Sequence, residues 1–367
     1  MNTQVDNILI GDCLVNLKSI EDNSIDCCVT SPPYYGLRDY GHDGQIGLEE
    51  TPEIFVSKLV EVFTEVRRVL KPCGTLWLNL GDSYAGSGKG SNPDGTIHHS
   101  ALNAKQGTHK GTIEGVKNLQ TAKSIGLKPK DLIGIPWMVA FALRNSGWYL
   151  RQDIIWNKPN PMPESVTDRC TKAHEYIFLL SKSEKYYYDN EAIKTEVADA
   201  TVQRMLQQIE NQKGSDRVPG KTNGTMKAVG PTRNPRKGID VNGGNQGSSI
   251  GIPAMAINGN GVKGHSGYFD KEGNLIGGGK ANKKSVWTVT TKPFKDAHFA
   301  TFPQELIVDC IKAGCPENGV VLDPFFGSGT TGVVSKKLNR NYIGIELNPK
   351  YVEIAKNRLY NEIGMFL

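Results

Sequence analysis

The residues best suited to chemistry in this sequence form a glycine-rich turn near the carboxyl end. Gly327-Ser328-Gly329-Thr330-Thr331-Gly332 matches G-x-G-x-x-G between an expected strand at residues 320–322 and an expected helix at residues 330–338. Glycines let a backbone approach a ligand closely, and a helix N-terminus presents unpaired N–H groups. Glu346, at the end of the next expected strand (342–345), could bind two ribose hydroxyls. The pattern therefore predicts a site for a nucleoside-containing cofactor.

An acidic residue ahead of the glycines narrows the choice of cofactor. The turn alone fits NAD, FAD or S-adenosylmethionine, and a tight turn without a ligand is the plainer alternative. The preceding Asp323-Pro324-Phe325 places a carboxylate where it would repel a pyrophosphate but could bind the ammonium of a methionine moiety. These residues favour S-adenosylmethionine.

A second candidate is Ser31-Pro32-Pro33-Tyr34, which directly follows an apolar run at residues 25–30. A bare S-P-P-Y is more often a simple turn or a polyproline segment. Its position favours a functional interpretation, because the carboxyl end of a parallel strand is where such sheets bind ligands.

Repeated strand–turn–helix order must position these two turns, and it predicts an α/β fold with a Rossmann-like parallel sheet. Thr51-Pro52-Glu53 has the signals of a helix start, and Lys71-Pro72 is expected to end that helix. The other expected strands are residues 8–10, 76–80, 148–156 and 176–180, and the other expected helices are residues 131–145 and 349–359.

Composition separates two glycine-rich segments from this regular framework. The chain has 367 residues, 41 glycines and a formal charge of +5, enough for one elaborated domain or two. Residues 81–126 contain nine glycines and are expected to be a long mobile loop. Residues 214–284 contain eleven Lys and Arg against four Asp and Glu. A basic insertion of this kind favours a polyanion partner over a merely solvated loop.

Other broad classes are disfavoured by simple counts. No apolar run approaches the ~20 residues that span a bilayer, and residues 1–10 lack the features of a signal peptide. None of the seven cysteines forms a C-x-x-C pair, so reduced, buried thiols in a cytoplasmic protein are expected, with no metal site.

Together, TSPPY (residues 30–34) and DPFFGSGTT (residues 323–331) give the chain a specific resemblance. The sequence resembles the amino-methylating DNA methyltransferases of restriction–modification systems and phages, in their permuted β-group order with the catalytic motif first and the cofactor loop last. The likeness includes GDCL (11–14), RVLKPCG (68–74), LWLNLGDSY (76–84) and HFATFP (298–303). It covers roughly residues 6–84, 131–190 and 285–360, and neither glycine-rich segment.

The resemblance implies a role for each residue of the S-P-P-Y turn. The Ser31 side chain and the Pro32 carbonyl would accept hydrogen bonds from the exocyclic amine of a base. Pro33 would stiffen the turn, and Tyr34 would stack on a base flipped out of the duplex. Serine at the first position favours cytosine N4 as the acceptor over adenine N6.

The same resemblance implies a cofactor pocket for S-adenosylmethionine. Asp323, Phe325, Gly327 and Gly329 would surround the methionine part, next to Thr330, and Glu346 would bind the ribose. Asp12 would accept from the adenine amine, although it could also be a turn residue. Phe302, within residues 298–303, would line the pocket, where His298 is expected to be structural.

Contacts to double-stranded DNA are expected from basic residues in three places. Lys158, beside Trp156, would contact the flipped base or nearby phosphates, although Trp156 could simply be core. Arg38 would probe neighbouring bases or form a local salt bridge with Asp39. Residues 191–284 would form a target-recognition insertion in a catalytic domain made of 1–190 and 285–367. Its candidates are Arg217, Arg233, Arg236, Lys237, Lys283 and Lys284.

The sequence thus predicts a site-specific DNA methyltransferase that acts as a monomer or homodimer, with a cognate restriction endonuclease as a possible partner. Three alternatives stay open. The acceptor could be adenine N6, the glycine turn could belong to an NAD-dependent oxidoreductase, or the chain could be a non-enzymatic DNA-binding protein with a vestigial fold.

Overall fold

The computed structural model describes residues 4–36, 42, 44–85, 126–197, 262–264, 267–269, 280–291 and 302–364. The chain divides into two compact units, Met1–Ala192 with Lys284–Leu367, and Ile193–Lys283. In the second unit, β6 (Thr195–Glu196) pairs with β9 (Lys280–Ala281), and β7 (Val262–Gly264) pairs with β8 (Gly267–Phe269). The target-recognition role of residues 191–284 stays a prediction, and residues 86–125 of the expected mobile loop lie outside the described residues.

The described part of the first unit contains an eight-stranded sheet with the order β1-β12-β11-β2-β3-β5-β4-β10. Neighbouring strands are parallel except around β5, which is antiparallel to both β3 and β4. The strands are β1 (Asn7–Ile10), β2 (Ile25–Thr30), β3 (Leu70–Leu80), β4 (Tyr149–Asn157), β5 (His174–Ser181), β10 (Val286–Thr288), β11 (Val320–Asp323) and β12 (Asn341–Glu346). This arrangement confirms the predicted α/β sheet.

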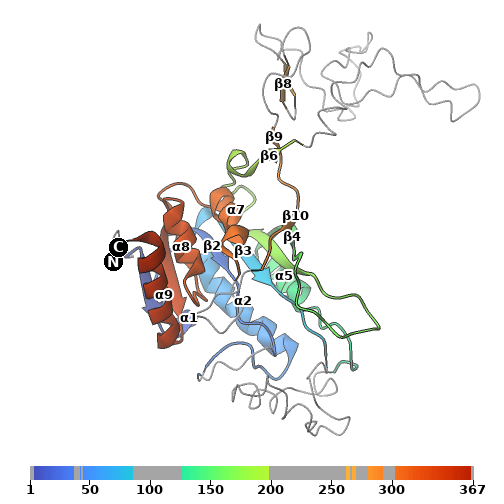
Figure 1. Ribbon diagram of the computed structural model, residues 1–367. Helices are drawn as coiled ribbons and strands as arrows, with labels where there is room; N and C mark the ends of the chain where they lie inside the picture. The colour runs from blue at the N-terminus through green and yellow to red at the C-terminus, as the bar shows by residue number, and fades with distance from the viewer. Residues whose placement is uncertain are drawn as a thin grey trace, which may run out of the picture. The chain divides into compact units, whose positions relative to one another are not determined.

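Two helical layers cover the sheet (Figure 1). One contains α1 (Cys13–Leu17), α2 (Pro52–Val69) and α5 (Ile135–Asn145), and the other contains α7 (Gln304–Gly314), α8 (Thr330–Lys337) and α9 (Pro349–Ile363). Adjacent strand residues point to opposite faces. Cys28 accordingly belongs to the core cluster that includes α1, α2 and α5, whereas Cys27 faces Gly314 at the end of α7. A short 3-10 helix, Glu191–Ile193, precedes β6.

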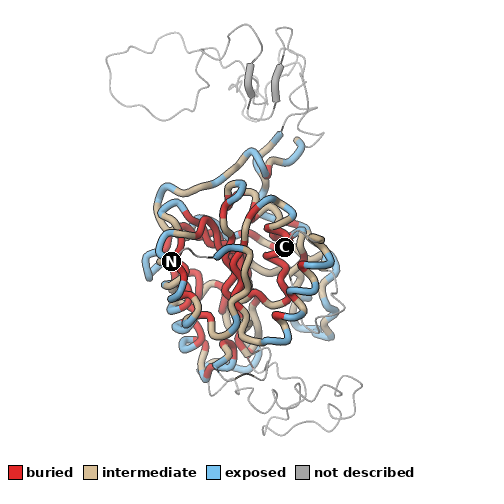
Figure 2. Tube along the Cα trace, turned by 90° about the vertical axis from the view of Figure 1, so that its left-hand side faces the viewer, coloured by how far each residue is buried: buried red, intermediate tan, exposed pale blue. Residues whose placement is uncertain are grey.

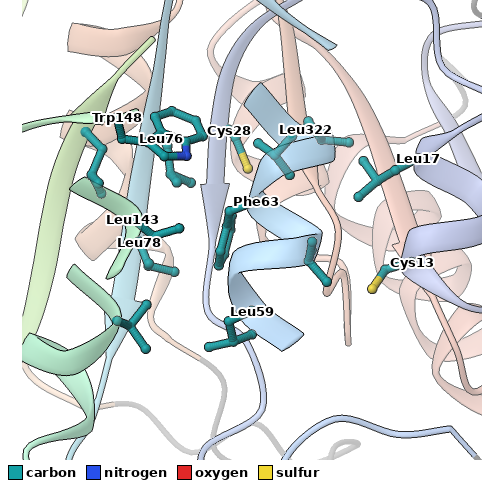
Figure 3. Close-up of a cluster of buried hydrophobic side chains, with 14 of the residues drawn as sticks. Cys13, Leu17, Cys28, Leu59, Phe63, Leu76, Leu78, Leu143, Trp148 and Leu322 are labelled. Atoms are coloured by element: carbon teal, nitrogen blue, oxygen red, sulfur yellow. The ribbon is translucent and has the colours of Figure 1, made fainter. Parts of the chain in front are cut away.

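A large core cluster lies between α2 and the middle of the sheet (Figure 3). Leu59 and Phe63 point from α2 toward Cys28, Leu76 and Leu78, and all five side chains are fully buried. Burial of each of the four leucine and phenylalanine side chains contributes about 1.5–3 kcal/mol. Buried residues are concentrated in the strands and the inward helix faces (Figure 2). This packing holds the strand ends, where the candidate residues lie, in fixed positions.

The helix predicted after Thr51 is present, and both its start and its end are as expected. Thr51 caps it by accepting from Ile54 N at 3.3 Å, and Pro52 is its first residue, as predicted. It also ends ahead of Lys71-Pro72, as predicted, since α2 ends at Val69, and both of these residues lie in β3. The pairing of β2 with β3 shifts register after Leu70, so Pro72 takes no ladder position opposite β2.

Helix α5 begins at Ile135, four residues later than expected, because an acidic side chain fixes its start. Asp82, after β3, accepts from Gly134 N at 3.0 Å and from Ile135 N at 3.1 Å. Gly134 has a φ of +84°, a left-handed conformation that suits glycine. A residue that follows β3 by two positions therefore fixes the start of the next helix in the described part of the chain.

All seven cysteines are free, as predicted. The expectation that all are buried was wrong for Cys73 and Cys170, which are exposed. Within the described ranges, no set of three or more His, Cys, Asp or Glu side chains is arranged to hold a metal ion. None of the described helices combines the length and apolar character needed to cross a membrane.

Candidate active site

The two candidate turns meet where the sheet changes its winding direction. From β11 the chain crosses through α8 to β12 on one side, and from β2 it crosses through α2 to β3 on the other. β11 and β2 are neighbours, with Val321 opposite Cys27 and Leu322 opposite Cys28. Ligands of open α/β sheets bind at such a point, outside the carboxyl ends of the strands. The fold thus brings Ser31 and Asp323 to one edge.

A buried carboxylate connects these turns directly. Asp323 accepts from Thr30 Oγ1 through Oδ1 and from Thr331 Oγ1 through Oδ2, both at 2.6 Å. Phe325 N also donates to Oδ1, at 3.0 Å. Asp323 is only 2% exposed, and this burial raises its pKa to about 6 although the three donors oppose the shift. Asp323 therefore ties β2 to the glycine turn, and its predicted contact with an ammonium stays a prediction.

The glycine turn itself is held by Glu346. Gly327 has a φ of +53° and donates from its N–H to Glu346 Oε2 at 2.8 Å, while Asn348 N donates to Oε1 at 2.8 Å. Burial raises the pKa of Glu346. A carboxylate offers about four acceptor positions, so these two bonds leave capacity for ribose hydroxyls. Gly329, with a φ of +79°, is the N-cap of α8, and a Cβ there would lie 3.0 Å from the Cβ of Ala355.

An arginine that the sequence did not indicate braces the start of α8. Arg358, on α9, donates to Thr330 Oγ1 at 2.8 Å and to Ser328 Oγ at 3.1 Å, and it pairs with Glu362 at 2.8 Å. Thr330 is buried, and its hydroxyl oxygen accepts the hydrogen bond from Arg358. No motif marks Arg358, because its role follows only from the packing of α9 on α8.

Asp12 lies at the end of β1, beside the end of β12. It caps α1 by accepting from Val15 N at 2.9 Å, which is the turn role considered for it, and Gly11 N donates to Glu346 O at 2.9 Å. The ends of β1, β12 and β11 therefore carry the acids Asp12, Glu346 and Asp323 along one edge. Such a row suits hydroxyl, amine and ammonium donors and disfavours a pyrophosphate. These residues fit S-adenosylmethionine better than a dinucleotide.

Two aromatic residues, Phe325 and Phe302, are candidates for the cofactor pocket. Phe325 is partly buried and packs against the core cluster that contains Leu322. Phe302 is half-buried just before α7, and its place in a pocket stays a prediction. His298 lies outside the described residues.

Tyr34, the last residue of the S-P-P-Y turn, and the following Tyr35 have different surroundings. Tyr35 is buried and packs against Phe55, with 5.5 Å between ring centroids. Tyr34 is half-buried, and its hydroxyl donates to Glu175 Oε2 at 2.7 Å. Gly36, two residues after this turn, donates from its N–H to Gly47 O at 2.8 Å. Tyr35 is therefore core, whereas Tyr34 lies at the carboxyl edge.

The candidates for DNA contact are only partly described. Lys158 forms an ion pair with Glu175, and its ammonium lies 4.1 Å from the ring centroid of Trp156. Trp156 is core, with Nε1 donating to Val289 O at 2.8 Å. Lys283 is half-buried and Lys284 exposed. The candidates outside the described residues are Arg38, Arg217, Arg233, Arg236 and Lys237.

Asp323 is expected to make the stability of the protein depend on pH. Its pKa is raised from 3.8 to about 6, so the folded protein holds this proton more tightly than the unfolded chain. The resulting stabilisation is complete below about pH 4 and is lost as pH rises through about 6, a change of about 3 kcal/mol. Asp323→Asn removes this dependence.

Urea unfolding of both proteins across this pH range measures the effect. The free energy of unfolding of the wild-type protein should fall relative to that of Asp323→Asn between about pH 4 and 7, and the difference should then become constant. A difference that does not vary with pH would show that Asp323 titrates normally.

Comparison with known proteins agrees with this geometry. A family model described as DNA methylase, for N6 and N4 methyltransferases, matches residues 25–357. The Type II methyltransferase M.Cfr9I of Citrobacter freundii is 42% identical over 96% of this chain and 87% of its own length. M.SmaI of Serratia marcescens, another Type II methyltransferase, is 40% identical over 96% of this chain and 90% of its own length.

Solved structures share the fold at low sequence identity. The cytosine-N4-specific PvuII DNA methyltransferase aligns with a TM-score of 0.55 and 16% identity, covering 98% of this chain and 93% of its own. A putative DNA modification methylase of Thermus thermophilus, solved with S-adenosyl-L-methionine, aligns with a TM-score of 0.50 and 19% identity, covering 98% and 96%. The extent of the family match and the identity to full-length relatives show that this chain belongs to the N6/N4 DNA methylase family.

Proposed function

We propose that this protein transfers a methyl group from S-adenosylmethionine to the N4 amine of a cytosine flipped out of double-stranded DNA. The observation that carries this proposal is the bond from Thr30 to Asp323, at 2.6 Å. The turn that begins at Ser31 and the glycine turn follow adjacent strands, which supports a shared site. Family membership disfavours the oxidoreductase and vestigial alternatives.

The chemistry required of the protein is mainly positioning. The exocyclic amine of cytosine is a poor nucleophile, because its lone pair is delocalised into the ring. Ser31 Oγ and the Pro32 carbonyl would accept its two N–H groups and favour a tetrahedral nitrogen, whose lone pair then becomes available. S-adenosylmethionine supplies, when bound, a sulfonium methyl group that an amine can attack. Pro33 has no N–H to compete for these acceptors.

The three acids at the strand ends would hold the cofactor in line with that nitrogen. Glu346 would bind the ribose hydroxyls, Asp12 the adenine amine and Asp323 the ammonium. Phe325, Gly327, Gly329, Thr330 and Phe302 would complete the pocket.

Two observations support cytosine over adenine as the acceptor. Ser31 stands at the position where the adenine-N6 enzymes of the amino-methylating DNA methyltransferases carry an aspartate. The PvuII enzyme, which shares the fold, is cytosine-N4-specific. The names of the relatives, Type II methyltransferases, support a restriction–modification role with a cognate endonuclease. The basic insertion at residues 191–284 would supply recognition of the DNA sequence.

Identification of the methylated nucleoside tests this function. Purified protein is incubated with double-stranded DNA and methyl-labelled S-adenosylmethionine, and the DNA is digested to nucleosides. We expect label in N4-methyldeoxycytidine. Label on adenine would overturn the choice of base, and no label in DNA would overturn the proposed activity.

A further inference from the structure

The Tyr34 ring is held at its hydroxyl by a residue from a distant part of the chain. Its OH donates to Glu175 Oε2 at 2.7 Å and lies 3.3 Å from Asn79 Oδ1. Glu175 is the second residue of β5, which is antiparallel to β3. The amino end of β5 therefore lies at the same edge as the carboxyl ends of the parallel strands. This direction of β5 brings the carboxylate to the S-P-P-Y turn.

The carboxylate of Glu175 is itself fixed and neutralised. Lys158 forms an ion pair with it, and the two side chains are only 18% and 15% exposed. Asn79 Nδ2 donates to the same Oε2 at 3.3 Å and to Tyr176 O at 3.1 Å. A sheltered charge is retained at low cost only when it is paired and hydrogen-bonded. Glu175 is thus a rigid acceptor for the Tyr34 hydroxyl.

The body of the ring is also confined. A Cβ at Gly81, just after β3, would lie 2.5 Å from Tyr34 Cε2 and 3.1 Å from its Cδ2. Gly81 therefore lets the ring pack directly against the backbone, while Glu175 holds its tip. Contacts at both ends restrict the two side-chain torsions of the tyrosine.

We propose that Glu175 is a positioning residue that holds the ring of Tyr34 in the orientation required to stack on the flipped base. Lys158 neutralises Glu175 and so keeps it in place. This inference rests on the proposed function, in which Tyr34 is the stacking residue. A ring fixed in advance loses little freedom when the base arrives, and a misplaced ring leaves the amine out of line with the methyl group.

A double-mutant cycle between Glu175 and Tyr34 tests this inference. The recognition site is first mapped from the DNA methylated by the wild-type protein, and a duplex with that site is the substrate. Glu175→Ala should lower kcat about 10- to 100-fold, because small displacements at a reacting centre have effects of this size. Glu175→Gln, which keeps an acceptor for the hydroxyl, should lose much less.

The background of Tyr34→Phe separates positioning from a structural role. Phenylalanine keeps a ring that can stack but has no hydroxyl for Glu175 to hold. If Glu175 acts through that hydroxyl, Glu175→Ala should have little further effect in Tyr34→Phe. An equal loss of kcat in both backgrounds, or no loss in either, would overturn the inference. Glu175→Met, which removes the acceptor but keeps a side chain of similar length, goes through the same cycle if Glu175→Ala does not fold.

Two further measurements complete the design. Glu65→Ala removes a glutamate of α2 that is also ion-paired, with Arg68 at 2.8 Å, and should leave kcat unchanged. Fluorescence of 2-aminopurine at the target position reports stacking of the flipped base, and it should increase in Glu175→Ala as the ring loses its fixed orientation. Unchanged fluorescence would count against positioning. If the wild-type protein transfers no label, the proposed function fails instead, which distinguishes the two failures.

Discussion

Replacing Ser31 with alanine is expected to lower the rate of methyl transfer about 10²- to 10³-fold, the usual effect of losing one preorganised hydrogen-bonding group at a reacting centre. The amine would lose one of its two acceptors, so its lone pair would remain delocalised. Ser31 follows β2, while the glycine turn follows β11 and is held by Glu346, Arg358 and Asp323. The Kd for S-adenosylmethionine should therefore change little.

Single-turnover rates and calorimetric titration with the cofactor measure the two quantities separately. Ser19→Ala is the matched control, because its hydroxyl donates only locally, to Asn16 O at 2.7 Å, after α1. It should leave both values unchanged. A Ser31→Ala protein that binds cofactor weakly would mean that the roles of the two turns are assigned wrongly, and full activity would exclude Ser31 as an acceptor.

Much of the fold could be predicted because local signals agreed with each other. The continuous apolar runs predicted β2 and β11, and the Thr51-Pro52-Glu53 signal predicted the start of α2. Helix α1 was missed because it has only five residues, too few for a periodic pattern. Helix α7 was missed although Leu306, Ile307, Cys310 and Ile311 repeat at helical spacing and are all buried.

Only those residues of the candidate site that belong to a recognisable sequence motif could be predicted. Both turns were found, because their residue types and their places after strands could be recognised together. The residues that brace them could not be found in this way. Arg358 and Glu175 act across the sheet or between helices, and each meets its partner through tertiary packing that leaves no pattern in the sequence. The hydrogen bond between Thr30 and Asp323 likewise forms only because β2 and β11 are neighbours in the sheet.

Tertiary packing around Gly344, on β12, supports the glycine turn. The ring of Phe326 lies directly over this glycine, so a Cβ there would be 2.4 Å from both Cγ and Cδ2 of the ring. Phe326 also stacks on Tyr342, with 5.6 Å between centroids, and its N–H donates to Ile345 O at 2.9 Å. Phe326, the residue before Gly327, thus anchors the glycine turn onto the sheet.

Replacing Gly344 with alanine is therefore expected to lower the free energy of unfolding by about 3 kcal/mol, the upper part of the usual range for an overpacked core. Cofactor affinity should fall with it, because the displaced ring belongs to the turn that we propose binds the cofactor. Without this clash, alanine in a strand would be slightly more stable than glycine. Urea unfolding and cofactor titration measure both losses.

The double variant Gly344→Ala/Phe326→Leu identifies the clash as the cause. Leucine lacks the ring that meets the new methyl group, so the double variant should be more stable than the sum of the two single changes predicts. Additive losses would mean that the methyl group is accommodated elsewhere, and an unchanged Gly344→Ala protein would show that Phe326 can move without cost. Recovery of cofactor affinity together with stability in the double variant would connect the packing beneath the turn to the binding site above it.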